Sequence, residues 1–328
     1  MKKINAAVVG SGFGDYVIIK ALKKFSNIKV NYLFSRNKQK LKKIALRENI
    51  PNFYSNYKKI NCINADLLCI ATTPYNQYKI LKNLKNKKIK YLFIEKPPSH
   101  NLKSFIELYK KFIKKKIFKK TLVDFIFLKL EPFLKFKEFL SKKKIIKVNI
   151  KWHFKAYHFK NRINTWKTDI KFGGGIYYFY LIHVVSYINF FFGTIEKIIS
   201  KKEKKNKYVH GCQIELQLKN GIKIFLDFNS NSNKSRNIHS INVLTKKSSL
   251  LLKNTSKDFV NGFKISKKNN NNNKPTLLKF KSINIKNQDN RILPVYLFVQ
   301  ELIKNRRNYP NFVDALRVMK DIDKCVKF

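Results

Sequence analysis

The chain has 328 residues, of which 44% are hydrophobic and 14% aromatic, and its 71 lysines and arginines against 19 acidic residues give a formal charge of +52. Length and apolar content predict about two globular domains and exclude a disordered chain. Because Lys, Asn, Ile and Phe are abundant and share A/T-rich codons, we attribute the charge to genomic base composition. A polyanion binder is the alternative, but we find no RNA-binding or helix-turn-helix motif, so nucleic acid is not the expected partner.

Cysteine usage and hydropathy indicate a protein of a reducing compartment, which we take to be the cytoplasm. No two of the four cysteines form a CxxC pair (Cys62, Cys69, Cys212, Cys325) and there are only six histidines, so we predict no disulfide framework and no metal site. The apolar run 4–9 is too short for a signal peptide. Residues 176–192 are strongly apolar but shorter than a membrane span and include His183, so we expect a buried helix and no membrane contact.

Residues 4–125 alternate between short β-rich runs and longer amphipathic segments. We expect strands at 4–9, 29–34, 67–71, 90–94 and 121–125, with helices at 13–25, 38–49, 77–84 and 103–114. Strand–helix alternation at this spacing predicts a doubly wound parallel sheet. We therefore assign residues 1–125 to an α/β Rossmann domain.

The pattern changes after about residue 128. We expect helices at 131–140, 173–192, 295–304 and 314–326, and strands at 145–154, 212–218, 222–228, 238–244 and 250–252. Lysine runs at 114–116, 142–144 and 201–207 and the asparagine run at 269–273 are predicted to be loops. Residues 126–328 are thus expected to form an α+β domain with a mostly antiparallel sheet, whose last helix is free to pack back on the first domain.

A glycine-rich turn follows the first predicted strand and reads Gly10-Ser11-Gly12-Phe13-Gly14-Asp15. Gly10 permits the tight turn, and Gly12 lets a pyrophosphate approach the backbone at the start of the next helix. Asp15 occupies the place of the third glycine of the dinucleotide fingerprint and is expected to bring an anion near the phosphates, for which Gly14 partly compensates. A turn without a ligand is the alternative.

Two further strand ends are expected to line the cofactor crevice. The second strand ends at Ser35-Arg36, where an acidic residue would bind the ribose of NAD; its absence favours NADP over NAD, unless Arg36 is only a surface cation. The strand expected at 67–71 ends at Thr72-Thr73-Pro74, which either line the crevice or form a simple turn.

The next strand ends in Glu95-Lys96-Pro97, where proline makes the backbone rigid and a cis bond is one option. Trp166-Lys167-Thr168-Asp169, Gly173-Gly174-Gly175, His183 and Asp314-Ala315-Leu316-Arg317 follow. Together these motifs resemble the Gfo/Idh/MocA family of NAD(P)-dependent oxidoreductases over nearly the whole chain.

The resemblance implies a Rossmann domain and a C-terminal α/β domain whose open sheet often joins the subunits of a dimer or tetramer. It implies reversible hydride transfer at a hydroxyl or carbonyl carbon of sugars, inositols or nucleotide-sugars. Lys96 matches the catalytic lysine and His183 the catalytic histidine. Alcohol oxidation needs a base for the hydroxyl proton, a part that a histidine or a depressed lysine can play, and a lysine cation can polarise a carbonyl in reduction. Glu95 and Lys96 are expected at the cofactor, and Lys96, Trp166, Tyr180 and His183 at the substrate.

The chain departs from the family pattern at several places. Phe179 stands where the family usually has Asp, Leu181 where it has Gly, Ser186 where it has a second Asp, and Tyr78 where it often has His. A weakened enzyme and a non-enzymatic dinucleotide-binding relative therefore remain alternatives to an active dehydrogenase. Tyr177, Tyr178 and Tyr180 line a sugar pocket or pack in the core. His153 and His158 flank the start of the second domain, a region that the resemblance places near the substrate, but their roles cannot be mapped from the sequence. His210 and His239 are expected to be sheet residues without a role.

Overall fold

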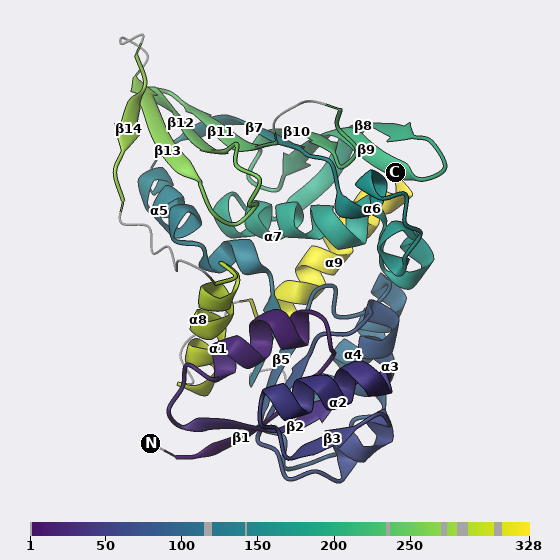
Figure 1. Ribbon diagram of the computed structural model, residues 1–328. Coiled ribbons are helices and arrows are strands. Elements are labelled where there is room, and N and C mark those ends of the chain that lie inside the picture. The colour runs from purple at the N-terminus through teal and green to yellow at the C-terminus, as the bar shows by residue number, and fades with distance from the viewer. Residues whose placement is uncertain are drawn as a thin grey trace. The chain divides into compact units, whose positions relative to one another are not determined.

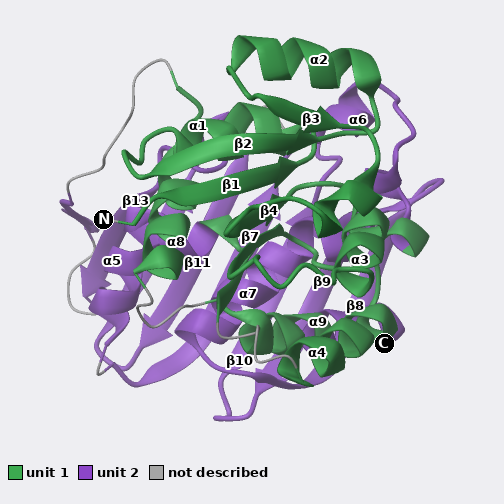
Figure 2. Ribbon diagram, turned by 90° about the horizontal axis from the view of Figure 1, so that it is seen from below, with its two compact units in different colours: residues 1–126, 171–173, 287–319 green, residues 127–170, 174–286, 320–328 purple. Residues whose placement is uncertain are grey.

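The computed structural model describes residues 2–114, 120–141, 143–233, 237–269, 274–280, 288–304 and 310–328. The chain divides into two compact units (Figure 2). Unit 1 comprises residues 1–126, 171–173 and 287–319, and unit 2 comprises residues 127–170, 174–286 and 320–328. Each unit has its own sheet, as Figure 1 shows.

Unit 1 is built on a six-stranded sheet in the order β3-β2-β1-β4-β5-β6. Every neighbouring pair is parallel, which is the arrangement of a Rossmann fold. The predicted parallel sheet is confirmed. Its strands are rich in Val, Ile and Leu because both faces are covered. Their bounds are Ile4–Val9 (β1), Ile28–Phe34 (β2), Asn52–Tyr54 (β3), Leu67–Ile70 (β4), Tyr91–Glu95 (β5) and Thr121–Asp124 (β6).

The helices of unit 1 lie close to their predicted positions, with one difference of type. Residues 13–25 were expected to form one α-helix, but a π-helical segment, Gly14–Ile19, precedes a single α-turn, α1 (Lys20–Leu22). The others are α2 (Lys38–Arg47), α3 (Pro74–Lys82), α4 (Leu102–Lys114) and α8 (Ile292–Ile303); α9 (Phe312–Lys327) begins in this unit. Phe312, the first residue of α9, contacts two rings of α4: it is tilted against Phe105 at 4.7 Å and stacked on Phe112 at 5.1 Å between ring centroids.

Unit 2 is built on an eight-stranded sheet in the order β14-β13-β12-β11-β7-β10-β9-β8. All neighbours are antiparallel except β7 and β10, which confirms the mostly antiparallel prediction. The strands are Ile145–His153 (β7), Ile195–Lys205 (β8), Val209–Leu218 (β9), Lys223–Asn229 (β10), Ile238–Thr245 (β11), Ser248–Asn254 (β12), Lys264–Asn269 (β13) and Thr276–Leu278 (β14).

One face of this sheet is covered by helices that carry aromatic side chains. These are α5 (Glu131–Leu140), α6 (Tyr157–Lys160), a π-helical segment Ile176–Leu181 and the α7 helix that continues it (Ile182–Phe191). Phe133 of α5 and Tyr187 of α7 are fully buried and lie 5.5 Å apart between ring centroids. Among the described residues no helix combines the length and apolar character needed to cross a bilayer.

The lysine-rich segment 201–207 was predicted to be a loop, and that prediction is wrong for most of its length. β8 continues to Lys205 and pairs with β9. An edge strand tolerates lysines because their alkyl stems cover the sheet while their charges discourage further pairing. Residues 115–116, 142 and 270–273 of the other predicted loops lie outside the described residues.

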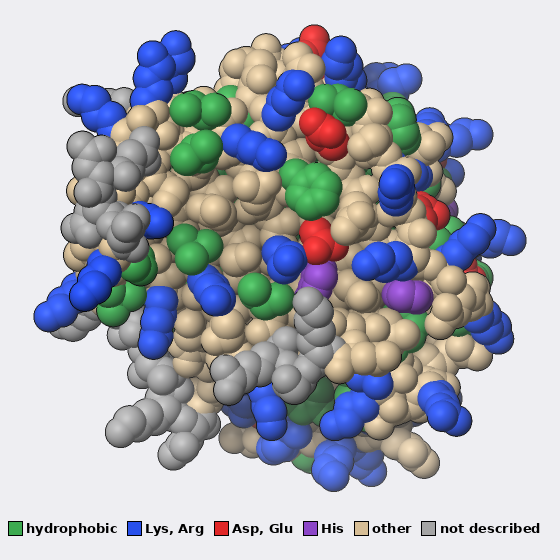
Figure 3. Space-filling model, turned by 90° about the horizontal axis from the view of Figure 1, so that it is seen from above, with side chains coloured by type: hydrophobic (Ala, Val, Ile, Leu, Met, Phe, Trp, Pro, Cys, Tyr) green, Lys and Arg blue, Asp and Glu red, His purple; other side chains and the backbone are tan. Residues whose placement is uncertain are grey.

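On the face drawn in Figure 3 the charged side chains are distributed rather than gathered. Figure 3 shows one face of the molecule, on which lysines and arginines are scattered among neutral side chains and acidic groups are few. The described strands of the eight-stranded sheet also expose a few apolar side chains, namely Ile146, Ile199, Phe225, Leu244 and Leu277.

Candidate functional site

The glycine turn lies where β1 ends and the π-helical segment begins. Gly10 has φ +122°, and a Cβ there would come within 2.1 Å of the Ala71 carbonyl oxygen, so only glycine fits. A Cβ on Gly12 would meet no atom within 4 Å, which leaves the backbone open to a ligand. A Cβ on Gly14 would lie 3.1 Å from the Val8 side chain, so Gly14 permits close helix–strand packing.

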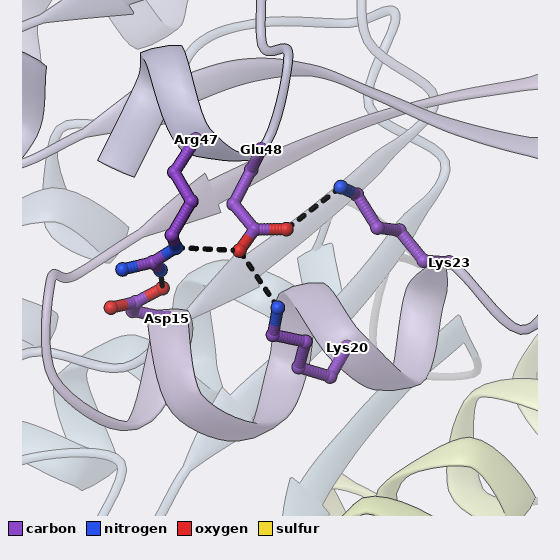
Figure 4. A network of polar contacts seen from close by, with 5 residues as sticks. All are labelled: Asp15, Lys20, Lys23, Arg47 and Glu48. Atoms are coloured by element: carbon purple, nitrogen blue, oxygen red, sulfur yellow. Dashed lines mark hydrogen bonds and ion pairs between the residues drawn. The ribbon is translucent and has the colours of Figure 1, made fainter. Parts of the chain in front are cut away.

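Asp15 does not present an uncompensated anion to the turn, contrary to our expectation. Its carboxylate is buried and accepts a hydrogen bond from the Arg47 guanidinium of α2 (Figure 4). Arg47 also donates to Glu48, which accepts further bonds from Lys20 and Lys23. Three cations thus surround two carboxylates, and the charge of Asp15 is neutralised within the protein.

Ser35 and Arg36 follow β2 beside the glycine turn. The Ser35 hydroxyl is buried and donates to the Ser11 hydroxyl at 2.8 Å, which joins the two strand ends. Arg36 is exposed and adjoins the hydroxyl of Tyr57, whose pKa is raised by burial and lowered in part by this guanidinium. The end of β2 therefore carries a cation and no carboxylate.

Thr72, Thr73 and Pro74 connect β4 to α3. Thr73 is the residue before the helix, and its hydroxyl accepts a hydrogen bond from Asn76 at 2.8 Å. Pro74 is the first residue of α3, where its missing N–H has no cost. The three residues lie at the carboxyl end of the parallel sheet, where ligands bind in open α/β folds.

Lys96 follows β5, and its backbone is held from both sides by Gln77 of α3. The Gln77 amide is fully buried and donates to the carbonyl oxygens of Glu95 at 2.9 Å and of Pro97 at 2.7 Å. The Lys96–Pro97 bond is cis. Gln77 was not identified from the sequence, because only the adjacent Tyr78 was considered at this place in the family pattern. The Tyr78 hydroxyl is turned outward and donates to Glu107 at 2.5 Å.

Lys96 is accompanied by two acidic side chains at neighbouring strand ends. Glu95 of β5 pairs in register with Asp124 of β6, and Asp124 is 1% exposed. Burial raises the pKa of Glu95, against the opposing charges of Lys96 and Arg291. Burial and the Glu95 carboxylate raise the pKa of Asp124 well above its usual range. Sequence reasoning missed Asp124 and Arg291.

The three consecutive glycines each meet a different steric demand. A Cβ on Gly173, which belongs to unit 1, would lie 2.8 Å from both Pro74 and the His100 backbone. A Cβ on Gly174 would lie 1.9 Å from the Trp166 carbonyl oxygen, so the start of the helix packs directly on the Trp166 turn. Gly175 has φ +68°. The glycine run is therefore required by packing and backbone conformation.

His183 lies in the first turn of α7, directly after the π-helical segment. It is 6% exposed, and its ring makes an edge contact with Phe127 at 5.3 Å. π-Helical turns within helices frequently mark functional sites. Phe179 lies edge-on to Trp166 at 5.5 Å, and the Lys167 ammonium lies over the Phe179 ring at 5.3 Å. Phe179, which stands where the family usually has Asp, thus belongs to an aromatic cluster with Trp166.

The tyrosines of the π-helical segment have different surroundings. Tyr177 and Tyr178 are buried, and Tyr177 donates to Glu203 of β8. Tyr180 instead lines a small pocket within unit 2, together with His158, Lys167, Thr168 and Tyr208. Burial, and secondarily Lys167, lower the pKa of His158 and favour its neutral form.

Three further histidines, His153, His210 and His239, occupy structural positions in the strands of unit 2. His153 Nε2 lies 2.9 Å from Asp227 Oδ2 at the end of β7. His210 and His239 lie in β9 and β11. The His239 ring stacks on Trp152 at 4.6 Å and is hydrogen-bonded to the Tyr187 hydroxyl, and burial lowers the pKa of His239 to about 3.

A parallel 3-2-1-4-5-6 sheet with an open glycine turn, joined to a mostly antiparallel α/β unit, defines the class of two-domain dinucleotide-binding oxidoreductases. Family models match both parts of the chain. Residues 4–119 match the oxidoreductase family with NAD-binding Rossmann fold, and residues 142–327 match its C-terminal α/β domain. The chain belongs to this Gfo/Idh/MocA oxidoreductase family, and the resemblance inferred from its motifs is confirmed.

The relatives found are distant in sequence, and the solved structures among them are similar in fold. An uncharacterized oxidoreductase of Synechocystis sp. is 24% identical over 80% of this chain and 75% of its own length. An oxidoreductase from Agrobacterium radiobacter, solved with NAD+, L-tartaric acid and magnesium, is 15% identical with a TM-score of 0.82 over 98% of this chain and 95% of that one. Levoglucosan dehydrogenase with NADH is 12% identical with a TM-score of 0.81 over 99% and 96%.

Proposed function

We propose that the protein transfers hydride between a nicotinamide cofactor and a hydroxyl or carbonyl carbon of a sugar-like substrate. Residues 1–125 would bind the cofactor and residues 126–328 the substrate. The observation that carries the proposal is the clamp on Lys96: Gln77 fixes the backbone on both sides of this residue at the carboxyl end of β5. A fixed lysine there is what proton transfer during hydride chemistry requires.

The cofactor would be held by the glycine turn and the strand ends beside it. The free space at Gly12 fits a pyrophosphate against the backbone, and the compensated charge of Asp15 does not oppose it. Residues assigned to this site are Gly10, Gly12, Phe13, Gly14, Ser35, Arg36, Thr72, Thr73, Pro74, Glu95 and Lys96. When bound, the nicotinamide supplies or accepts the hydride.

We propose NADP(H) as the preferred cofactor, on the basis of Arg36. The guanidinium is exposed at the end of β2, where a 2′-phosphate would be bound and where no carboxylate would repel it. A charge-assisted hydrogen bond of this kind contributes about 1.5–3 kcal/mol. Arg36→Ala should therefore weaken NADPH binding by about 10- to 150-fold and leave NADH binding nearly unchanged. Equal weakening of both cofactors would contradict the assignment.

On the substrate side we assign roles to Lys96, His183, Trp166 and Tyr180. Lys96 and His183 would exchange the hydroxyl proton, and Trp166 and Tyr180 would contact the sugar. The Agrobacterium oxidoreductase was solved with L-tartaric acid and levoglucosan dehydrogenase with levoglucosan.

The proposal is tested by titrating the protein with NADPH and NADH, followed by turnover on a panel of sugars, inositols and sugar acids. Loss of Lys96 as acid or base should reduce kcat by about 10²- to 10⁴-fold in Lys96→Ala. Lys90→Ala is the matched control, because Lys90 precedes the same strand and pairs with Asp66 at 3.0 Å. Turnover of Lys96→Ala at the wild-type rate would remove Lys96 from the mechanism.

We also propose a homo-oligomer formed through the open sheet of unit 2, in a reducing compartment such as the cytoplasm. Phe225 of β10 is 38% exposed and lies between Asn149 of β7 and Glu215 of β9 in register. An exposed aromatic side chain in the middle of a polar sheet face suits burial against a second copy.

All four cysteines are free thiols, which suits the proposed reducing compartment (Cys62, Cys69, Cys212 and Cys325).

A further inference from the structure

Two carboxylic acids lie next to each other behind Lys96, an arrangement that the proposed proton exchange does not by itself require. Glu95 and Asp124 end adjacent parallel strands and are paired in register, so their side chains leave the sheet on the same side about 4.8 Å apart. The two carboxyl groups are within hydrogen-bonding reach of each other. Two ionised carboxylates cannot donate to each other, so this contact requires a proton.

The surroundings of Asp124 support the same conclusion. Neither of its carboxyl oxygens accepts a hydrogen bond from a donor within the described residues. A buried ionised carboxylate without donors is strongly disfavoured, whereas a protonated one can donate to the Glu95 carboxylate. Asp124 is thus the member of the pair that carries the proton.

The charges that face the pair balance when one proton is present. Lys96 and Arg291 face both carboxyls. Arg291 is also bound by Asp289 through two hydrogen bonds, of 2.9 and 2.5 Å, and lies over the Phe13 ring of the glycine turn at 5.3 Å. The net charge of this cluster is −1 when its three acids (Glu95, Asp124, Asp289) and two cations (Lys96, Arg291) are all ionised, and zero when one acid is protonated. A neutral cluster is favoured in a poorly solvated site.

We propose that Glu95 and Asp124 share one proton and act as the proton reservoir of Lys96, with Asp124 as a positioning residue. The inference rests on the proposed function. When a carbonyl is reduced, its carbon gains the hydride of a reduced nicotinamide and its oxygen takes a proton from the Lys96 ammonium. The neutral amine then regains a proton from the pair, which is left with two negative charges until solvent returns one. Oxidation runs through the same steps in reverse.

The proton itself is tested by isotope-edited infrared spectroscopy on the full-length protein at neutral pH. A protonated side-chain carboxyl gives a carbonyl stretch that shifts on 13C-aspartate labelling, and we expect this band in the wild type and its loss in Asp124→Asn. Asp66→Asn is the matched control, because Lys90 and a backbone N–H lower the pKa of Asp66 and keep it ionised. The band should persist in that variant. Absence of the band in the wild type overturns the proposal.

Coupling to Lys96 is tested by the pH profile of Lys96 acetylation with acetic anhydride, read by peptide mass spectrometry. In the alkaline range the wild-type pair reaches two negative charges and holds Lys96 as ammonium, whereas Asp124→Asn leaves one. Lys96 should therefore acetylate about tenfold faster in Asp124→Asn, corresponding to a pKa lower by about one unit. Identical profiles overturn the coupling. Both results can hold in a protein that fails to bind NADPH and NADH, so failure of the proposed function is separately visible.

Discussion

Replacing Glu48 by glutamine tests whether the network in Figure 4 anchors the helix that follows the glycine turn. Glu48 is 4% exposed and accepts hydrogen bonds from Lys20 at 2.8 Å, Lys23 at 2.7 Å and Arg47 at 2.9 Å. These three donors hold the pKa of Glu48 at about 2 despite burial, against 4.5 ordinarily. At about 1.4 kcal/mol for each pH unit this corresponds to about 3 kcal/mol. The three cations are nearly half exposed, so solvent screening reduces the expected loss in Glu48→Gln to about 2 kcal/mol.

The sign of the pH dependence follows from the lowered pKa. The carboxylate stabilises the fold fully above the unfolded pKa of about 4.5, and this stabilisation is lost as the pH falls toward 2. Urea unfolding should therefore separate wild type from Glu48→Gln at pH 7, with the gap closing below pH 4. Glu107→Gln is the control, because its contacts with Lys82 and Tyr78 lie at the exposed surface, where solvent screens them, so the substitution should leave stability almost unchanged. Equal effects of the two variants would refute the reasoning.

Three other predictions follow from single contacts. His239 is held neutral with a pKa of about 3, so the unfolded state binds its proton first and stability should fall by about 2 kcal/mol between pH 6.5 and 5; His239→Gln should lack this fall in urea unfolding. Phe225→Lys should convert an oligomer to monomer in light scattering if the open sheet joins the subunits, and an unchanged mass would exclude that face. Gly174→Ala places a Cβ 1.9 Å from the Trp166 carbonyl, so calorimetry should show a loss of at least about 2 kcal/mol; an unchanged midpoint would show that the backbone yields.

The parallel sheet could be predicted because its central strands are mostly buried on both faces and carry apolar runs such as Leu67–Ile70. β3 could not be predicted, because three residues are too few to show a strand pattern that differs from a loop. The π-helical start of the first helix was hidden because its apolar residues also satisfy an α-helical period. β8 was missed over most of its length because its lysines give no alternating apolar pattern, while an edge strand tolerates charges that a central strand does not.

Some residues of the candidate site could be predicted from the sequence and others could not. Lys96 and His183 stood out through short motifs that remain visible in a single sequence. Asp124 did not, because its importance comes from the register of β5 against β6, which brings it beside Glu95 from 29 positions along the chain. The signal that could have revealed Asp124 is a carboxylate at the end of a strand that is otherwise apolar, next in the sheet to a strand that also ends in a carboxylate.

Gly12→Ala separates the role of the glycine turn in binding from its role in folding. A Cβ at Gly12 meets nothing within 4 Å, and its backbone does not adopt a positive φ, so the variant should be as stable as the wild type or gain up to about 1 kcal/mol by restricting the unfolded chain. The same methyl group would occupy the space through which a pyrophosphate approaches the backbone. We therefore expect an unchanged or higher urea midpoint together with at least about tenfold weaker NADPH binding, as followed by tryptophan quenching. Gly10→Ala is the contrasting variant, because its Cβ collides with Ala71 and should lower stability directly. NADPH binding of wild-type strength in Gly12→Ala would mean that the phosphates do not approach the protein at this turn.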